Sequence, residues 1–117
     1  MTEPENQTLE YLEGISPHAR AIGLEVLSKE THRTLMRLPY AEHLVGDPDT
    51  GVIHGGVITA MLDNACGHTV RMEDEELTIA TLDLRIDYMG PATPGEDLMA
   101  EAVCFKRTTN VAFVRGS

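Results

Sequence analysis

Residues 78–89 show the most regular hydrophobic pattern in the chain, an alternation of apolar and polar side chains. One face would carry Leu82, Leu84, Ile86 and Tyr88, and the other Thr81, Asp83, Arg85 and Asp87. A period of two residues is typical of a β-strand. The same reasoning predicts a hairpin over residues 23–38, a strand over 97–107 and another that begins within 110–115.

The long apolar segment from Gly56 to about Met72 predicts a helix. Its apolar residues cover more than one side, and only Asp63, Asn64 and His68 interrupt them. A helix of this composition is expected to be largely buried, at the centre of the domain.

Two other segments complete the predicted organisation. Residues 8–15 are expected to form a short amphipathic helix that ends near Ser16-Pro17, because proline disfavours helix in the residue before it. Residues 43–56 are rich in glycine, aspartate and proline and predict an irregular loop. The order of elements predicts a single α+β domain over 1–117, with an antiparallel sheet packed against the long helix.

Composition and charge narrow the possible partners. The net charge of −10 opposes attraction to nucleic acid or to an anionic membrane. No apolar run approaches the roughly 18–20 residues that span a bilayer, and the acidic N-terminus is unlike a signal peptide. We therefore expect a cytoplasmic protein with no nucleic-acid or membrane partner. Cys66 and Cys104 lack zinc-site spacing and are interpreted as small core residues.

The segment His54-Gly55-Gly56 joins the glycine-rich loop to the predicted helix. Glycines at a helix N-terminus leave backbone N–H groups unshielded, at the positive end of the helix dipole, where they can hold a developing oxyanion. A plain glycine-rich turn would have the same sequence, so this segment alone leaves both interpretations open.

Asp63 interrupts an otherwise apolar helix. Burial of an ionised carboxylate is costly unless the group is paired or functional. In a pocket, Asp63 could act as a general base toward water or attack a carbonyl directly. The alternative is that it caps a neighbouring segment or pairs with an arginine.

Together, GVIHGGVITAMLDNACG and TLDLRIDYMGPATPGE resemble the PaaI-like (phenylacetyl-CoA thioesterase-like) branch of hotdog-fold acyl-CoA thioesterases. The resemblance covers about residues 15–115 and includes two motifs, His-Gly-Gly-x6-Asp and Thr-x-Asp-Leu-x-Ile-x-Tyr-Met-x-Pro. It implies the hotdog fold, in which an antiparallel sheet wraps around a long central helix. It also implies hydrolysis of a small, medium-chain or aryl acyl-CoA to free acid and CoA, without metal or organic cofactor.

The resemblance assigns roles to individual residues. Gly55 would supply the N–H that binds the oxyanion, and Gly56 beside it would help to bind the substrate. Asp63 would be the base or nucleophile. Thr81 would orient the attacking water, and His54 would shape the loop near the thioester. The resemblance further implies a homodimer or a homotetramer built as a dimer of dimers, with each active site between two subunits.

The phosphates of coenzyme A must meet local cations in so acidic a protein. The candidates are Arg71, Arg85, Lys106, Arg107 and Arg115. We expect Lys106 and Arg107, at the end of a predicted strand, to bind the phosphates; the alternative is that they are ordinary solvated charges.

The sequence departs from the family pattern at Pro48, where many members have an asparagine six residues before the motif histidine. Asp47 or Asp49, on either side of this position, could stand in for the asparagine with a shifted loop, although neither is assigned a catalytic role. The strand that begins within 110–115 has no closing turn before Ser117. We therefore expect the natural chain to continue.

Three other functions use the same residues. A hotdog-fold hydratase or dehydratase would use His54 with Asp63, although the longer motifs of those enzymes are missing. A non-catalytic acyl-CoA-binding protein would use the same cleft. A metal site of His54, Cys66 and His68 would not match a recognised zinc spacing. No GxSxG segment supports serine-hydrolase chemistry.

Overall fold

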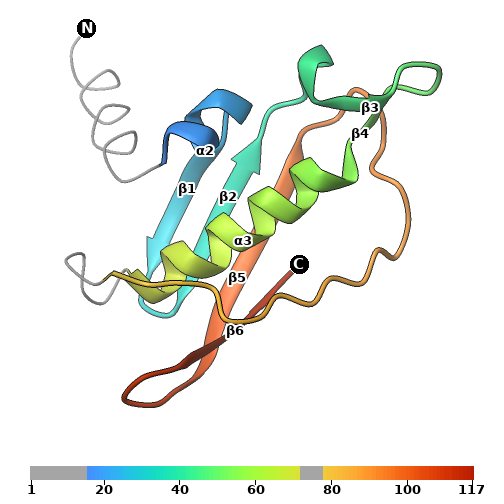
Figure 1. Cartoon of the computed structure of the whole chain (residues 1–117). Coiled ribbons are helices and arrows are strands. Elements are labelled where there is room, and N and C mark those ends of the chain that lie inside the picture. Colours follow the sequence, from blue (N-terminus) through green and yellow to red (C-terminus); the bar gives the residue numbers. More distant parts are fainter. Residues whose placement is uncertain (1–15, 72–77) are drawn as a thin grey trace, which may run out of the picture.

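A four-stranded antiparallel sheet and one long helix form the body of the molecule (Figure 1). The computed structural model describes residues 16–71 and 78–117. The strands follow the order β1-β2-β5-β6 in the sheet, and α3 (Gly55–Arg71) lies across one face. Their bounds are Glu25–Glu30 for β1, Arg33–Leu38 for β2, Leu98–Arg107 for β5 and Ala112–Gly116 for β6. This arrangement confirms the predicted antiparallel sheet with a long central helix.

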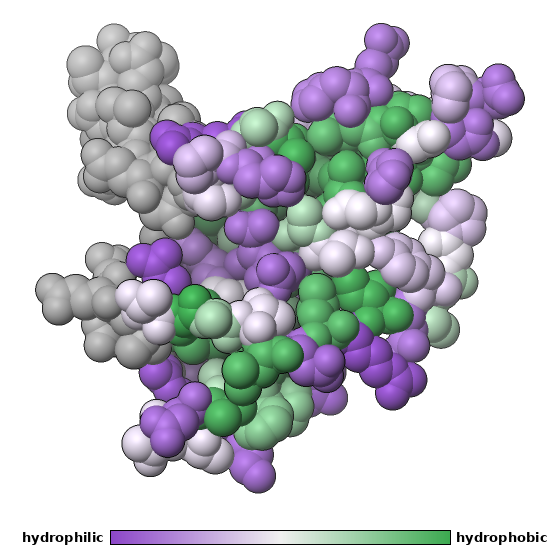
Figure 2. All heavy atoms as spheres, viewed as in Figure 1, coloured by the Kyte–Doolittle hydropathy of each residue, from purple (hydrophilic) through white to green (hydrophobic). Residues whose placement is uncertain are grey.

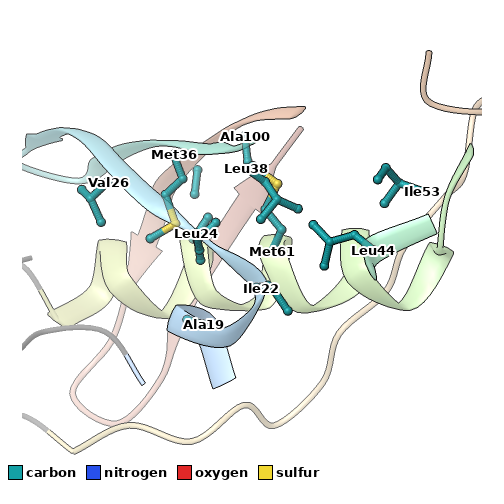
Figure 3. Packing of buried hydrophobic residues seen from close by; sticks show 12 residues of the cluster. Ala19, Ile22, Leu24, Val26, Met36, Leu38, Leu44, Ile53, Met61 and Ala100 are labelled. Atoms are coloured by element: carbon teal, nitrogen blue, oxygen red, sulfur yellow. The ribbon is translucent and has the colours of Figure 1, made fainter. Parts of the chain in front are cut away.

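The core lies between the sheet and α3. Met36 of β2 and Met61 of α3 are almost fully buried there, at 1% and 2% exposure (Figure 3). Opposite them, β5 contributes Ala100 and Ala102, which are also buried. Small side chains on β5 let the helix approach the strand closely, because protein interiors are close-packed.

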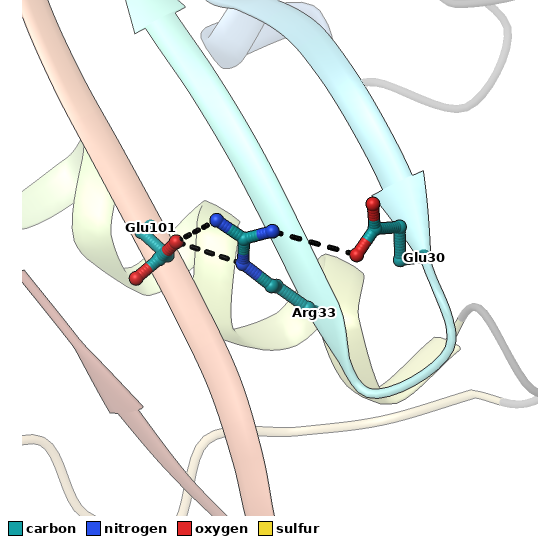
Figure 4. A network of polar contacts seen from close by, with 3 residues as sticks. All are labelled: Glu30, Arg33 and Glu101. Atoms are coloured by element: carbon teal, nitrogen blue, oxygen red, sulfur yellow. Dashed lines mark hydrogen bonds and ion pairs between the residues drawn. The ribbon is translucent and has the colours of Figure 1, made fainter.

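The β1–β2 hairpin confirms the pairing predicted for residues 23–38. Its turn contains His32, which has a positive φ of 67°. Next to the turn, the Arg33 guanidinium donates to the Glu101 carboxylate on β5 and also reaches Glu30 at 3.4 Å (Figure 4). All three side chains are partly exposed to solvent, so this network contributes little to stability.

A short helix, α2 (Pro17–Ile22), begins where the sequence had predicted a helix end. The Ser16 side chain accepts a hydrogen bond from the Ala19 N–H at 3.1 Å, and Pro17 occupies the first turn. Serine before proline is a helix start of this kind, since proline lacks the N–H that a first turn leaves unsatisfied. Sequence reasoning missed this helix. The helix expected over 8–15 lies outside the described residues, so its end near Ser16-Pro17 stays a prediction.

The segment predicted to be an irregular loop, 43–56, contains regular structure. A 3-10 turn, η1 (Glu42–Leu44), leads into a small hairpin of β3 (Val45–Asp47) and β4 (Val52–Ile53). A β-carbon on Gly46 would lie 2.8 Å from the His54 Cα, so glycine is needed where β3 passes this residue. The dense glycine, aspartate and proline residues form the turn of this hairpin.

Residues 78–97 contain no strand within the described chain, which corrects the strand predicted over 78–89. The segment is extended and passes in front of the molecule in Figure 1. Leu82 is 81% exposed and Met89 is 94% exposed, whereas Ile86 is half-buried. An alternating pattern indicates an extended chain, but a strand also requires a neighbouring backbone in register, and the described part of this chain supplies none.

Candidate active site

The N-terminus of α3 carries the His54-Gly55-Gly56 segment. His54 precedes the first helical residue, and its carbonyl accepts a hydrogen bond from the Val57 N–H at 2.9 Å. Its imidazole Nδ1 accepts a hydrogen bond from the Gly56 N–H at 2.8 Å. Gly55 is the first residue of the helix, so no carbonyl within the helix can accept its N–H. This N–H is the group at the helix start best placed to bind an anionic oxygen.

The bond from Gly56 fixes the chemistry of His54. A peptide N–H can only donate, so Nδ1 must accept, and neutral His54 carries its proton on Nε2. A β-carbon on Gly56 would lie 2.9 Å from Nδ1, and a side chain there would displace the imidazole. Gly56 therefore serves the site by holding His54, and its own N–H is already used.

Asp63 and Thr81 meet on the same side of α3. The Thr81 hydroxyl donates to Asp63 Oδ1 at 2.7 Å. Asp63 is half-buried in the helix, and Thr81 comes from the extended segment, which passes close to α3 at Gly67. The sequence predicted both residues, and the structure brings them together.

A cavity of about 200 Å³ lies beside this pair. Its wall includes Leu24, Met36 and Ile79, which give it an apolar part. The polar part comes from Asp63, Thr81 and Ser16. Three further residues of α3 also contribute to it: Asn64, His68 and Arg71. Apolar walls with a few convergent polar groups are typical of small-molecule sites.

Cys66 lies one helical turn from Asp63 and remains a thiol. Burial raises its pKa, and the nearby Asp63 carboxylate raises it further. Because the thiolate is the nucleophilic form, this environment makes Cys66 less reactive than a free cysteine.

Gly55 and Asp63 lie on one helix, separated by eight residues. At 1.5 Å per residue, they are about 12 Å apart along the axis. One thioester carbonyl therefore cannot contact both groups of the same chain.

Sequence reasoning missed the role of Tyr88. Its hydroxyl donates to the Gly55 carbonyl at 2.9 Å and also forms a hydrogen bond with the Thr59 hydroxyl. A tyrosine among leucine and isoleucine residues was the available signal, because its hydroxyl usually finds a partner when the ring packs.

Lys106 and Arg107 do not lie together. The Lys106 ammonium sits over the Phe113 ring, 5.7 Å from its centroid. Val114 of β6 packs against the core beside α3, so its neighbour Phe113 points to the opposite face of the sheet. Lys106 lies over Phe113 and is therefore on that opposite face. Arg107 pairs with Ala112, whose side chain shares the face of Val114. Only Arg107 of the two therefore lies on the sheet face that carries α3.

Pro48 lies in the turn between β3 and β4, and its neighbour Asp47 is structurally engaged. The Asp47 carboxylate accepts hydrogen bonds from the Asp49 N–H and the Thr50 hydroxyl, both at 3.0 Å. These bonds hold the turn, and Asp47 is not placed as a substitute for the missing asparagine.

Two properties concern the described residues as a group. Across 16–71 and 78–117, no three His, Cys, Asp or Glu side chains form a group that could hold a metal ion. No helix in these same ranges is long and apolar enough to cross a membrane.

Comparison with known proteins identifies the family. The sequence profile described as thioesterase superfamily matches residues 50–117, more than half of the chain. The chain belongs to the thioesterase superfamily. Membership confirms the expected hotdog fold and class of enzyme, a thioester hydrolase.

Curated relatives of this superfamily member include named thioesterases. The medium/long-chain acyl-CoA thioesterase YigI of Escherichia coli is 31% identical over 113 residues, which cover 85% of this chain and 72% of that protein. A putative esterase of Halobacterium salinarum is 33% identical over 85 residues, 69% of this chain. The matched part spans 55% of the length of the Halobacterium protein.

Solved structures of the superfamily share the fold. A protein from Pseudomonas aeruginosa superimposes with a TM-score of 0.77 and 40% identity, covering 92% of this chain and 79% of that one. A mutant of the phenylacetic acid degradation protein PaaI from Thermus thermophilus gives a TM-score of 0.76 with 25% identity, covering 86% and 84%. These similarities confirm the PaaI-like resemblance.

Proposed function

We propose that this protein is an acyl-CoA thioesterase in which Asp63 and Thr81 hold the attacking water. The observation that carries the proposal is the 2.7 Å hydrogen bond between them at the cavity wall. An ionised carboxylate only accepts hydrogen bonds, so the Thr81 hydroxyl uses its proton on Asp63. The hydroxyl oxygen then accepts from a water molecule, whose second proton points to the carboxylate.

The proposed reaction is hydrolysis at the thioester carbonyl. Asp63 removes a proton from water as the water oxygen bonds to the carbonyl carbon, and the carbonyl oxygen becomes negative. The Gly55 N–H stabilises that oxygen. The negative oxygen then re-forms the C=O bond as the C–S bond breaks, and the electron pair of that bond leaves with sulfur. The proton held by Asp63 passes to the sulfur, which yields the free thiol of CoA and regenerates the carboxylate. A general base contributes a factor of about 10²–10⁴, and an oxyanion donor about 2.7–4 kcal/mol.

The proposal includes self-association as a homodimer or a dimer of dimers, in which Gly55 of one subunit serves Asp63 and Thr81 of another. The 12 Å estimate along α3 supports this, because one chain cannot present both groups to one carbonyl. Exposed apolar side chains on the extended segment, above all Leu82 and Met89, also favour a covering partner. Figure 2 shows hydrophobic side chains gathered on the face of the molecule where this segment runs.

The cavity supports a small, medium-chain or aryl acyl group as substrate. Its volume of about 200 Å³ exceeds the roughly 150 Å³ of an engineered apolar cavity that binds benzene. Its apolar wall of Leu24, Met36 and Ile79 suits a hydrocarbon. The proposal also includes a cytoplasmic location.

Hydrolysis is favoured over hydration or dehydration by the state of His54. In those reactions a histidine would remove or deliver a proton. Here Nδ1 already accepts from Gly56, and Nε2 carries the proton of the neutral ring. His54 can therefore donate a hydrogen bond, but as a base it would have to give up its contact with Gly56.

A thiol-release assay over short-chain, medium-chain and aryl acyl-CoAs tests the proposal. We expect free thiol from at least one class, and far less from Asp63→Asn protein. A folded protein that binds these compounds and releases no thiol would instead be an acyl-CoA-binding protein. Addition of water to an enoyl-CoA without release of thiol would instead identify the protein as a hydratase.

A further inference from the structure

The Gly55–Gly56 peptide is held at both ends by side chains. Its N–H, from Gly56, donates to His54 Nδ1 at 2.8 Å. Its carbonyl, from Gly55, accepts from the Tyr88 hydroxyl at 2.9 Å. Rotation of this peptide plane would break both bonds, so the two side chains fix its orientation between them.

Thr59 completes the arrangement. Its hydroxyl lies 2.5 Å from the Tyr88 hydroxyl oxygen and 3.2 Å from the Gly55 carbonyl. The Thr59 and Tyr88 hydroxyls have one proton each, and both are placed to donate to the Gly55 carbonyl, so either hydroxyl can be the donor in the bond between them. The hydrogen bonds thus connect Thr59 and Tyr88 with the Gly55–Gly56 peptide and, through this peptide, with His54. Hydrogen bonds in such a chain polarise and strengthen one another.

The Tyr88 side chain is 54% exposed, and its ring comes near the start of α3. A β-carbon on Gly55 would lie 3.7 Å from the ring, which is ordinary packing distance. The ring therefore lies against the helix start while the hydroxyl binds the carbonyl of the same residue. Removal of the hydroxyl alone would preserve this packing.

We propose that Tyr88 is a positioning residue for thioester hydrolysis, acting through the Gly55–Gly56 peptide. It touches no reacting atom. It keeps the first turn of α3 in the orientation that presents the Gly55 N–H, and it holds His54 in the form that carries its proton on Nε2. The effect of Tyr88 on catalysis rests on the proposed function, whereas its effect on the His54 tautomer is present without substrate.

Tyr88→Phe tests the proposal, with Tyr40→Phe as a matched control. The Tyr40 hydroxyl also donates to a backbone carbonyl, that of Gly51 at 2.7 Å, but it is not bonded to α3. We expect Tyr88→Phe to lower kcat about 2- to 12-fold, the effect of one net hydrogen bond, with little change in KM. Tyr40→Phe should leave kcat unchanged. Equal losses in both variants, or none in Tyr88→Phe, would overturn the positioning role.

Nitrogen-15 NMR of the histidine rings supplies a readout independent of turnover. His54 should show protonated Nε2 and unprotonated Nδ1 in the wild type, assigned by loss of its signals in His54→Gln. In Tyr88→Phe, and in Thr59→Val as a second variant, we expect a mixture of the two tautomers. Unchanged His54 signals in both variants would overturn the link through the peptide. If the wild type releases no thiol, the proposed function fails, while the NMR comparison still decides whether Tyr88 controls His54.

Discussion

At the residue scale, the burial of Asp63 is explained by what lies around it. A carboxylate in an apolar helix is costly unless something satisfies it, and the Thr81 hydroxyl supplies one hydrogen bond. The cavity beside it leaves room for a further hydrogen-bond donor. In the proposed function, a water molecule in this cavity is the donor from which Asp63 accepts a proton.

Asp63→Asn should lower kcat by about 10²–10⁴, because it removes the base while nearly preserving size and leaves Thr81 a partner. Steady-state thiol release measures this, and circular dichroism shows whether the fold persists. Asp83→Asn is a matched control, since Asp83 is exposed on the same extended segment as Thr81. Turnover close to wild type in the Asp63 variant would exclude the general-base role.

Cys66 reports the charge of Asp63 without any substrate. Asp63 is one of two causes that raise the pKa of the Cys66 thiol, so Asp63→Asn should lower that pKa and increase the thiolate fraction at a given pH. In a Cys104→Ser background, alkylation of Cys66 near pH 8 should be faster in Asp63→Asn than in the parent. Equal alkylation rates over pH 7–9 would contradict a charged Asp63 near this thiol.

Individual site residues could be predicted where the residue type itself was unusual. An aspartate inside an apolar helix and a glycine pair at the helix start are visible in sequence, and the family motif added Thr81. Tyr88 could not be assigned, because its contact to Gly55 depends on how the extended segment lies over the helix. Alternation alone placed Tyr88 on an apolar face and said nothing of its hydroxyl.

At the element scale, prediction succeeded where the hydrophobic pattern of a single segment is enough to indicate its structure. The helix α3 and the strands β1, β2, β5 and β6 follow from periodicity. The helix α2 was missed because proline both ends helices and begins them, and the Ser16 cap marks Pro17 as a helix start. The strand predicted over 78–89 is not formed within the described chain, because a strand needs a paired neighbour and periodicity describes one segment alone.

The β5–β6 hairpin carries a prediction about the phosphates of coenzyme A. Arg107 lies on the sheet face that carries α3, whereas Lys106 lies over Phe113 on the other face. We expect Arg107→Ala to raise KM for acyl-CoA more than Lys106→Ala does, and most clearly at low salt, where charge attraction is least screened. Steady-state kinetics at several ionic strengths measure the difference. An unchanged KM in both variants at low salt would remove the hairpin from the substrate site.

At the scale of the whole molecule, the separation of Gly55 from Asp63 favours a site shared between chains. A two-fold axis that places two α3 helices side by side would bring the start of one near the middle of the other. Each dimer would then contain two such sites. Because Thr81 binds Asp63 within one chain, these two residues belong to the same half of each site.

Mixed dimers test the shared site. One subunit carries Asp63→Asn, and the other carries Gly55→Pro, which removes the N–H at a first helical position where proline is well tolerated. Each homodimer should be inactive, whereas in the heterodimer one of two sites has both groups intact, so activity should approach half of wild type. Tag-purified heterodimers that are folded and no more active than either parent would exclude the shared site.

The hydrogen bonds of Thr81 and Tyr88 to α3 also restrict the length of the extended segment between these two residues. Thr81 is tied to Asp63 and Tyr88 to Gly55, with six residues between the two ties. An insertion or deletion among residues 82–87 would break one tie or the other while the sheet remained intact. By contrast, a β-carbon on Gly90 or Gly95 would meet nothing within 4 Å, so we expect the segment near these glycines to tolerate changes in length better. Length differences between this protein and working relatives should therefore fall in that segment, and deletion scanning should separate loss of activity from loss of folding at residues 82–87.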